Sequence, residues 1–394
     1  MIREKKNILF LTFYYTPDLC AGSFRAASLI NSMLRKYPDE YFITVITTMP
    51  NRYNTFKSEP PIFESTERIK IIRIKIPNHN NGFLSQSFAF SKYFFKVLYL
   101  TRNTKFDLIF ATSSRLFTAF LGSVVAFKST SKLYLDIRDI FIDTINDVFP
   151  NQFLKFFLIP FLTKIEYFTF KQSSHINLVS EGFKSYFENK YKKKYSFFTN
   201  GIDEEFLEYK FKKCIPTQKK IITYAGNIGE GQGLENILPE LAVRLGSDYL
   251  IQVIGDGSTK IRLVEKIKTL NVLNIILFKP LKRLELCEVY RESDFLFLHL
   301  NKLEAFEKVL PSKIFEYAAT SKKIIAGVSG FPFEFIKLNL PDSILFSPYD
   351  VDSCYNQIIS NNLGISIENR INFIKKYKRA NIMDRMASSI FEYI

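Results

Sequence analysis

Short runs of hydrophobic residues recur along the first half of the chain, and segments of helical length separate them. The runs are rich in β-branched and aromatic residues, which is typical of strands buried on both faces. Strands that alternate with helices predict a parallel sheet covered by helices on both sides. The predicted strands are NILFLTFYY, YFITVITTM, IKIIRIKI, FDLIFATS, KLYLDIRD, HINLVS and KYSFFTNG.

The same alternation starts again after a charged and aromatic connector, IDEEFLEYKFKKCIPTQKK. The sequence therefore predicts an α/β fold with two doubly wound, Rossmann-like domains that face each other across a central cleft. We expect an N-terminal domain at 1–205, a C-terminal domain at 206–378, and a terminal helix at 379–394 that packs back on the N-terminal domain. The predicted strands of the second domain are IITYAGNIG, YLIQVIGDG, NIILFKP, DFLFLHLN and KKIIAGVSG.

The composition is that of a chain that folds throughout. It has 394 residues, of which 47% are hydrophobic and 24% are charged, so two or three domains can each bury a core. The first hydrophobic run ends at TPD and predicts a strand, not a signal peptide. The four cysteines and three histidines lack the spacing of a zinc or haem site. This pattern favours a reducing, cytoplasmic setting.

The net charge of +15 indicates a partner that carries phosphate, on nucleic acid, on anionic lipid or on a nucleotide. No recognition helix, RNP-like strand or basic tail supports nucleic acid. Two segments rich in phenylalanine, Phe83 to Leu100 and Phe153 to Phe170, are interrupted by lysines and do not predict membrane-spanning helices. Together with the charge, they predict peripheral association with an anionic membrane surface at the inner face of the cell membrane.

Glycines follow the first strand of the second domain, in YAGNIGEGQGLENIL. In open α/β sheets ligands bind at the carboxyl ends of strands, where glycines let backbone N–H groups approach a phosphate. The spacing of Gly226 and Gly229 matches neither a Rossmann fingerprint nor a Walker loop. A phosphate loop and a turn without a ligand therefore explain these glycines equally well, and GDGSTK further along is a weaker case.

The loop and helix after the first strand, PDLCAGSFRAAS, contain Gly22 and Arg25. A cation in the first turn opposes the helix dipole, so its presence has another cause or is accidental. A solvated arginine is the simpler interpretation. An arginine at the end of a strand also has the geometry to bind a phosphate or carboxylate with two hydrogen bonds.

The segment KLYLDIRDIF places three charged residues at the end of another strand. Alternation puts Asp136 and Arg138 on one face, where a salt bridge between them is the simple expectation. Asp139 falls at the strand exit. It is a candidate to accept a proton from an acceptor hydroxyl, although an aspartate that caps the next helix is almost as good an interpretation.

The segment PSKIFEYAA predicts a helix that begins near Pro311, with Lys313 and Glu316 on one face at i,i+3 spacing. An ordinary ion pair is the simple interpretation. The order of the two charges opposes the helix dipole, and this favours an anion site at the start of the helix with a ribose-binding carboxylate one turn later.

Taken together, these motifs resemble the retaining glycosyltransferases of family 4, which have the GT-B fold. The resemblance rests on motif order along nearly the whole chain: YYTPDLCAGSFR, DIRD, VSEGF, TNGID, AGNIGEGQGLENI, VIGDG and PSKIFEYAATSKKIIAG. The combination of GNIG and QGLE with PSKIFEY is most similar to the branch that includes N-acetylfucosamine transferases of bacterial O-antigen and capsule assembly. The resemblance implies a nucleotide diphosphate sugar as donor, with UDP favoured.

The resemblance also implies roles for individual residues. Glu316 corresponds to the glutamate that holds the ribose hydroxyls, and Lys313 to a cation that contacts the diphosphate. Gly22 corresponds to the N-terminal glycine near the diphosphate. The diphosphate loop corresponds to Gly226, Asn227 and Gly229, and the base-binding backbone to Pro280 and Leu281.

Three positions depart from the family pattern. Lys308 stands where many members have a glutamate that contacts the donor sugar, so that Glu304 or Glu307 would have to replace it. Asn227 and Gln232 stand where members have an arginine and a lysine. We expect Lys313 and Arg25 to provide the missing positive charge, and Asp139 to correspond to the acceptor-side residue, which makes Asp139 and Lys313 the catalytic candidates.

The implied function is transfer of a sugar with retention to a lipid-linked or oligosaccharide acceptor, in surface polysaccharide assembly. The diphosphate charge would be stabilised without a metal or other cofactor. We expect a monomer or dimer. A nucleotide-sugar 2-epimerase on the same fold and a non-catalytic basic protein that binds nucleotides or membranes are the alternatives.

Overall fold

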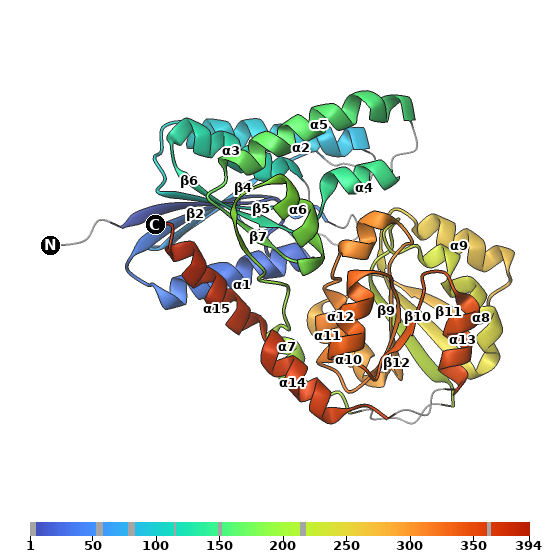
Figure 1. The fold of residues 1–394 in the computed structure, drawn as a ribbon. Helices are drawn as coiled ribbons and strands as arrows, with labels where there is room; N and C mark the ends of the chain where they lie inside the picture. Colours follow the sequence, from blue (N-terminus) through green and yellow to red (C-terminus); the bar gives the residue numbers. More distant parts are fainter. Residues whose placement is uncertain are drawn as a thin grey trace. The chain divides into compact units, whose positions relative to one another are not determined.

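The computed structural model describes residues 5–52, 58–77, 83–113, 116–148, 152–212, 218–360 and 364–394. The chain forms two units, one of Met1–Asn200 with Ala380–Ile394 and the other of Gly201–Arg379. The first boundary falls slightly before the expected position between residues 205 and 206. The last helix belongs to the first unit, as Figure 1 shows in red.

The first unit is built on an eight-stranded sheet with the order β3-β4-β2-β1-β5-β6-β7-β8. Neighbouring strands run parallel, except that β3 is antiparallel to β4. The central strands are buried on both faces, which explains their continuous hydrophobic runs. The strands are β1 (Lys6–Thr12), β2 (Tyr41–Thr48), β3 (Phe63–Ser65), β4 (Ile69–Ile74), β5 (Leu108–Ser113), β6 (Lys132–Ile137), β7 (His175–Leu178) and β8 (Lys194–Ser196).

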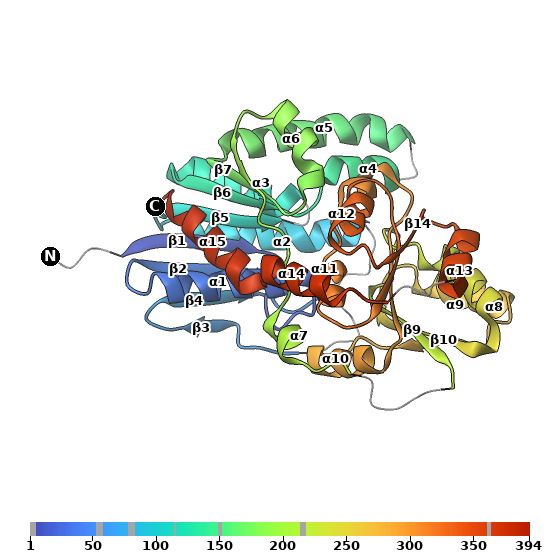
Figure 2. The same cartoon turned by 60° about the horizontal axis from the view of Figure 1, so that its bottom comes forward.

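Helices cover both faces of this sheet (Figures 1 and 2). On one face lie α2 (Phe83–Thr101), α3 (Leu116–Ser129) and α5 (Gln152–Gln172). On the other lie α1 (Ala21–Lys36) and the terminal helix α15 (Arg379–Phe391), whose Phe391 stacks on the Tyr37 ring at 3.6 Å between centroids. The shorter helices of this unit are α4 (Phe141–Val148), η1 (Glu181–Phe183) and α6 (Lys184–Lys190).

The second unit has a six-stranded sheet with the order β11-β10-β9-β12-β13-β14, and all pairs are parallel. Each strand that the hydrophobic runs predict is present in the two units. The runs missed β3 and β14, which have three residues each. The strands are β9 (Lys220–Asn227), β10 (Tyr249–Asp256), β11 (Ile275–Phe278), β12 (Phe295–His299), β13 (Lys323–Gly327) and β14 (Ile344–Phe346).

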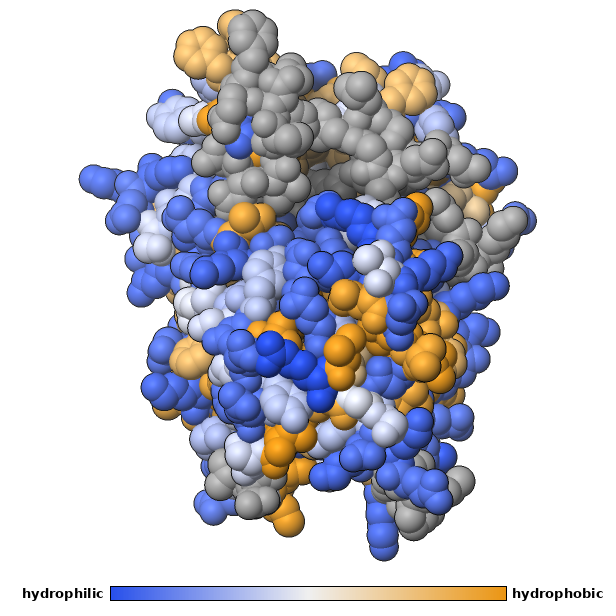
Figure 3. Space-filling view, turned by 90° about the vertical axis from the view of Figure 1, so that its right-hand side faces the viewer, coloured by the Kyte–Doolittle hydropathy of each residue, from blue (hydrophilic) through white to orange (hydrophobic). Residues whose placement is uncertain are grey.

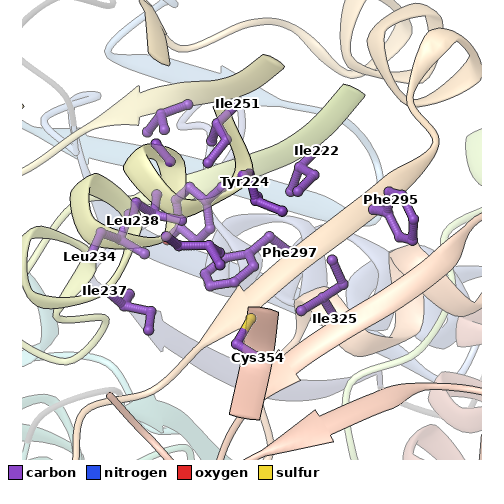
Figure 4. Close-up of a cluster of buried hydrophobic side chains, with 14 of the residues drawn as sticks. Ile222, Tyr224, Leu234, Ile237, Leu238, Ile251, Phe295, Phe297, Ile325 and Cys354 are labelled. Atoms are coloured by element: carbon purple, nitrogen blue, oxygen red, sulfur yellow. The ribbon is translucent and has the colours of Figure 1, made fainter. Parts of the chain in front are cut away.

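Helices also cover both faces of the second sheet, which is the doubly wound arrangement that the sequence predicts. The core on one side fills the space between the sheet and α8, with Tyr224 and Phe297 packed against Leu234 and Leu238 (Figure 4). The helices are α7 (Glu204–Glu208), η2 (Leu234–Asn236), α8 (Leu238–Leu245), η3 (Gly246–Asp248), α9 (Lys260–Thr269), α10 (Arg283–Glu292), η4 (Glu304–Lys308), α11 (Lys313–Ala318), α12 (Phe331–Asn339), α13 (Val351–Ser360) and α14 (Ile367–Tyr377).

Within the described part of the chain, no helix is long and apolar enough to cross a membrane. Hydrophobic side chains nevertheless reach the surface of the second unit, among them Leu273, Ile276 and Leu284. On the face drawn in Figure 3, hydrophobic side chains lie in patches between hydrophilic ones. Small hydrophobic patches are normal for a folded protein, because apolar atoms contribute more than half of its surface.

Candidate functional site

Each sheet has a point at which its winding reverses. In the second unit the chain passes from β9 to β10 and β11 on one side, and then returns to β12 on the other side of β9. In the first unit β1 and β5 flank the corresponding point. Ligands of doubly wound folds bind at such points, outside the carboxyl ends of the strands. A ligand site of the second unit is therefore expected at the loops after β9 and β12.

Three of the residues singled out from the sequence meet at this point of the second unit. Lys313, the first residue of α11, places its Nζ atom 2.7 Å from Oε2 of Glu316. A Cβ atom at Gly226, at the end of β9, would lie 3.5 Å from Cε of Lys313. The Lys313 side chain therefore stands directly against the Gly226 backbone, and the two loops form one polar site.

The Lys313–Glu316 pair is only partly shielded from solvent. The side chain of Lys313 is 24% exposed, whereas that of Glu316 is 9% exposed. Because α11 has only six residues, its dipole is small, and the positive charge at this site comes mainly from Lys313. The simple interpretation of the spacing, an ion pair at i,i+3, is thus what the structure shows, and it lies at the position where a ligand would bind.

The glycine loop after β9 is a tight turn. The Gln232 N–H donates to the Gly229 carbonyl at 2.9 Å, and a Cβ atom at Gly229 would lie only 2.5 Å from Nδ2 of Asn227. The Asn227 side chain in turn donates to Oε1 of Gln232 at 2.9 Å. Two of the three positions at which the sequence departs from the family pattern, Asn227 and Gln232, therefore form one neutral hydrogen-bonded pair.

The close packing of two loops explains why GDGSTK contains two glycines. Gly255 at the end of β10 has a φ of +149°, and a Cβ atom there would lie 1.9 Å from the Gly226 carbonyl oxygen. Gly257, with a φ of +158°, would place a Cβ atom 2.2 Å from the Ile228 carbonyl oxygen. Only glycine permits the loops after β9 and β10 to approach this closely. This second glycine motif shapes the loop after β9.

His299, which the sequence analysis did not select, connects the loops around the site. It is fully buried at the end of β12, and its Nδ1 is 2.6 Å from the Gln232 carbonyl oxygen. Its Nε2 accepts a hydrogen bond from the Tyr349 N–H at 3.2 Å, so the ring is neutral with its proton on Nδ1. Burial lowers the pKa of His299 to about 4. A polar residue within an otherwise hydrophobic strand, FLFLH, was the available signal.

The two carboxylates close to Lys308 in the sequence, Glu304 and Glu307, contact other side chains. Lys308 Nζ is 3.3 Å from Oε1 of Glu304, an i,i+4 pair in which the Glu304 side chain is 78% exposed. Oε1 of Glu307 accepts a hydrogen bond from the Ser329 hydroxyl at 3.4 Å. Neither glutamate has a geometry that singles it out as the replacement for the glutamate of the family pattern.

Pro280 and Leu281 lie half-buried in the loop between β11 and α10. The next residues contain an arginine that the sequence analysis did not select. Burial disfavours the charge of Arg283, but the neighbouring carboxylates of Asp203 and Glu316 raise its pKa. Its Nη2 is 2.5 Å from Oδ2 of Asp203. Arg283 is thus an electrostatic neighbour of Glu316.

In the first unit Arg25 and Arg138 have the opposite roles to those that the sequence predicts. Arg25 is 1% exposed, and its Nε and Nη2 atoms each lie 2.9 Å from an oxygen of Asp136. Its guanidinium also donates to the carbonyl oxygens of Thr199 and Phe198, at 2.7 and 2.6 Å. Arg25 therefore holds the core of the unit and is not free to bind a phosphate, and Asp136 pairs with Arg25 in place of the expected Arg138.

The partners of Asp136 explain why its charge is tolerated in the core. Thr112 and Asn177 also donate to this carboxylate, at 2.9 and 2.8 Å. Burial by itself would raise the pKa of Asp136, but the Arg25 guanidinium and the hydrogen bond from Asn177 hold this pKa below its usual value. The hydrophobic stripe of α1, with Arg25 between Gly22 and Leu29, was the signal that this arginine faces the sheet.

Arg138 lies where the sequence analysis placed Arg25. A Cβ atom at Gly22, in the first turn of α1, would lie 1.9 Å from Nη1 of Arg138. The absence of a side chain at Gly22 therefore makes room for this guanidinium at the carboxyl end of the sheet. Asp139 follows in the loop between β6 and α4 and is half-buried. Gly22 and Arg138 therefore meet at this end of the sheet, and Asp139 is the residue after Arg138 in the chain.

The match to a family model lies in the second unit. A family model described as "Glycosyl transferases group 1" matches residues 205–376. Over 101 residues the chain is 41% identical to the Escherichia coli (strain K12) protein named as a colanic acid biosynthesis glycosyl transferase, WcaI. This match covers 25% of the chain and 24% of WcaI. The matched part thus spans about a quarter of the length of that curated relative.

Solved structures of similar fold cover nearly the whole chain. Sucrose-phosphate synthase from Thermosynechococcus elongatus has a TM-score of 0.77 at 11% identity, over 98% of this chain and 99% of that chain. HepE from Anabaena in complex with UDP-glucose has a TM-score of 0.69 at 13% identity, over 98% and 100%. WaaG, a glycosyltransferase involved in lipopolysaccharide biosynthesis, has a TM-score of 0.70 at 12% identity, over 97% and 99%.

At these identities the structural likeness establishes the fold alone. The two parallel-sheet α/β units match the GT-B glycosyltransferase structures, which confirms the predicted fold class. The family model and the relative from colanic acid biosynthesis support a group 1 glycosyltransferase.

Proposed function

We propose that the protein is a retaining glycosyltransferase of family 4, close to the N-acetylfucosamine transferase branch. It moves a sugar from a nucleotide diphosphate sugar, preferably a UDP-sugar, to a lipid-linked or saccharide acceptor in the assembly of a surface polysaccharide such as O-antigen or capsule. It works at the inner face of the cell membrane. The relative named for colanic acid biosynthesis and the structural neighbour bound to UDP-glucose support this choice.

The observation that carries the proposal is the contact between two loops of the second unit. Lys313 and Glu316 lie against Gly226 at the point where the sheet reverses its winding. In the proposed complex the Lys313 ammonium binds the diphosphate and the Glu316 carboxylate accepts hydrogen bonds from the ribose hydroxyls. The glycine loop at Gly226, Asn227 and Gly229 approaches the diphosphate with its backbone, and the base lies against Pro280 and Leu281.

The proposed chemistry follows from these contacts. The bond between the anomeric carbon and the diphosphate oxygen breaks, and a new bond forms between that carbon and the acceptor oxygen. The acceptor hydroxyl loses its proton, for which Asp139 is the proposed base. The leaving diphosphate gains negative charge, and Lys313 stabilises this charge more strongly in the transition state than in the ground state. No metal ion has a role in this scheme.

Nucleotide release tests this proposal. The full chain is incubated with UDP-, GDP- and ADP-sugars, with and without a lipid-linked saccharide acceptor, and the free nucleotide is measured. We expect acceptor-dependent release of UDP that persists in EDTA, and a product whose anomeric configuration, read from its NMR coupling constants, is that of the donor.

Other outcomes would replace the proposal. Conversion of a UDP-sugar to its 2-epimer without acceptor would identify an epimerase. A product of inverted configuration would overturn retention. Loss of activity in EDTA would show that a metal ion is needed, so that Lys313 does not stabilise the diphosphate charge by itself. If calorimetry detects no affinity for UDP, GDP or ADP, the donor site itself is wrong.

A further inference from the structure

The outer side of the helix layer α2, α3 and α5 in the first unit is unusually rich in exposed aromatic residues. We call this side the aromatic face. Phe156 is 75% exposed and Phe95 is 68% exposed, although both are large hydrophobic side chains. Grouped exposure of this kind marks an interaction surface. The exposed aromatic residues of the three helices are Phe88, Phe95, Tyr99, Phe127, Phe156, Phe157, Phe161 and Tyr167.

The orientation of α2 places these rings outward. Tyr93 is fully buried on the opposite side of the helix, where its hydroxyl is 2.9 Å from the Ile46 carbonyl oxygen of β2 and 3.3 Å from the Thr12 carbonyl oxygen of β1. This anchor fixes the rotation of the helix about its axis. At spacings of three and four residues, Lys92, Phe95 and Tyr99 then share the outer side.

The charges of the aromatic face have a single sign. α2 and α3 contain no acidic residue, and the one acidic residue of α5 is Glu166. Glu166 is 2% exposed and accepts hydrogen bonds from the hydroxyls of Tyr186 and Tyr191. The three helices therefore present only lysines to a partner: Lys92, Lys96, Lys128, Lys155, Lys164 and Lys171.

A groove of about 590 Å³ adjoins this face between β4, the strand next to the edge strand β3, and the helix α2. Ile72, Ile74 and Leu100 form part of its apolar lining. Its rim contains three exposed lysines, Lys75, Lys92 and Lys96.

These three lysines are available to a ligand. The groove also contains Arg73, but this arginine is buried and paired with Glu64. Within the residues that the structure describes, Lys75 and Lys92 make no ion pair, and Lys96 lies only over the Tyr99 ring, at 5.2 Å from its centroid. An apolar groove with unpaired cations at its rim fits a ligand that is both anionic and apolar.

We propose that the aromatic face lies on an anionic bilayer and that the groove between β4 and α2 holds one anionic lipid, with its phosphate at the lysines of the rim and its apolar part in the groove. The exposed rings enter the interface between headgroups and acyl chains, while the lysines stay at the level of the phosphates. The inference deepens the proposed function, on which it rests for the lipid-linked acceptor. A second copy of the chain is a poorer occupant, because self-association through this face would bring six lysines against six lysines.

Vesicle co-sedimentation of the full chain tests the surface. We expect binding to vesicles of phosphatidylcholine with one third phosphatidylglycerol, weak binding to phosphatidylcholine alone, and a loss of affinity as salt increases. Because each lysine at an anionic surface contributes roughly fivefold in affinity, Lys75→Glu/Lys92→Glu should weaken binding by more than about twentyfold. The matched control is Lys268→Glu/Lys337→Glu, two exposed lysines of the second unit, with the same change of net charge.

The aromatic contribution has its own control. Phe95→Ser/Phe156→Ser should reduce binding at least tenfold at any salt concentration, whereas Leu273→Ser/Ile276→Ser, two exposed residues of the second unit, should leave it unchanged. Circular dichroism shows whether each variant folds. Equal losses in the control variants, or no binding of the unsubstituted chain to anionic vesicles, would overturn the proposal.

Two further measurements separate the sources of the anion and the two proposals. Inorganic phosphate should not compete with the vesicles at millimolar concentration. If it does, the groove is a site for free phosphate, and if Phe95→Ser/Phe156→Ser instead abolishes a dimer in sedimentation, the partner is a second copy. UDP affinity should be unchanged in all these variants, so a missing vesicle interaction with intact UDP binding refutes only the lipid surface, and the reverse result refutes only the donor site.

Discussion

Two cations of this protein, Arg25 and Lys313, occupy similar positions in their units but differ in burial and in their partners. Arg25 lies in the first helix of the first unit and Lys313 begins a helix of the second unit, and each helix follows a strand that flanks the reversal of its sheet. Arg25 is 1% exposed and bound to Asp136 by two hydrogen bonds, whereas the Lys313 side chain is 24% exposed and contacts one oxygen of Glu316. A cation at such a position is therefore a site residue only if its side of the helix is open to solvent.

The largest expected effect concerns the buried member of this comparison. Arg25→Met leaves the Asp136 carboxylate buried without its cation, and we expect the free energy of unfolding of the first unit to fall by about 3–5 kcal/mol in chemical denaturation. Arg25→Met/Asp136→Leu should recover much of this loss. The control is Arg35→Met on the same helix, whose exposed pair with Asp384 contributes about 1 kcal/mol or less. Equal stability of Arg25→Met and the control would contradict the structural role.

The second prediction uses the neutral histidine beside the donor loops. Folded His299 stays neutral down to about pH 4, whereas an unfolded histidine takes up its proton near pH 6.5. The unfolded state binds more protons between these values, so the stability of the second unit should fall as the pH drops from about 6.5 to 4. The difference between the two pKa values corresponds to a loss of about 3 kcal/mol in the free energy of unfolding.

Thermal unfolding at several pH values checks this prediction. His299→Gln should flatten the pH dependence of the second unit. His175→Gln should flatten that of the first unit, because burial and Lys194 also lower the pKa of His175 to about 4. An unchanged slope in His299→Gln would show that this ring is not the group that titrates.

The third prediction concerns the exposed cation. Lys313→Met removes a charged hydrogen-bond donor from the proposed diphosphate site, and we expect UDP affinity to fall roughly tenfold to hundredfold in calorimetry. Lys268→Met, on the exposed side of α9, is the control for the loss of one positive charge. Unchanged UDP affinity in Lys313→Met would refute the role of this lysine.

A companion variant distinguishes the ribose contact from the diphosphate contact. Glu316→Gln should lower the affinity for UDP about tenfold and leave the affinity for 2′,3′-dideoxy-UDP almost unchanged. Only UDP has the ribose hydroxyls that donate hydrogen bonds to the carboxylate. An equal loss for both nucleotides would mean that Glu316 acts only by positioning Lys313.

The smallest effect is expected from restoring the charges of the family pattern. Asn227→Arg/Gln232→Lys replaces the neutral pair of the glycine loop by two partly exposed cations. We expect UDP affinity to rise about threefold to fivefold, and the gain to disappear at high salt. A loss of affinity would show that the hydrogen bond between Asn227 and Gln232 is needed to hold the loop.

The sequence predicted those residues of the candidate site that have a local signal in the sequence. Gly226 stood out because it lies at the end of a buried strand, and Lys313 and Glu316 because the order of their charges opposes the helix dipole. The three residues lie together in the structure. Arg25 had the same signal and is buried in the core. His299 and Arg138 had weak signals, since a single polar residue at a strand end does not indicate which loop it will contact.

The hydrophobic pattern of the sequence by itself determined the alternation of strands and helices, and with it the two doubly wound units, because burial of a strand or of one helix side depends on the local order of residues. The tertiary structure alone decided the partners of the polar residues. Arg25 and Asp136 are separated by 111 residues, and Lys75 and Lys92 meet at one groove only because α2 packs beside β4. A charge in the core is stable only beside its partner, so burial and pairing are settled when distant elements pack together.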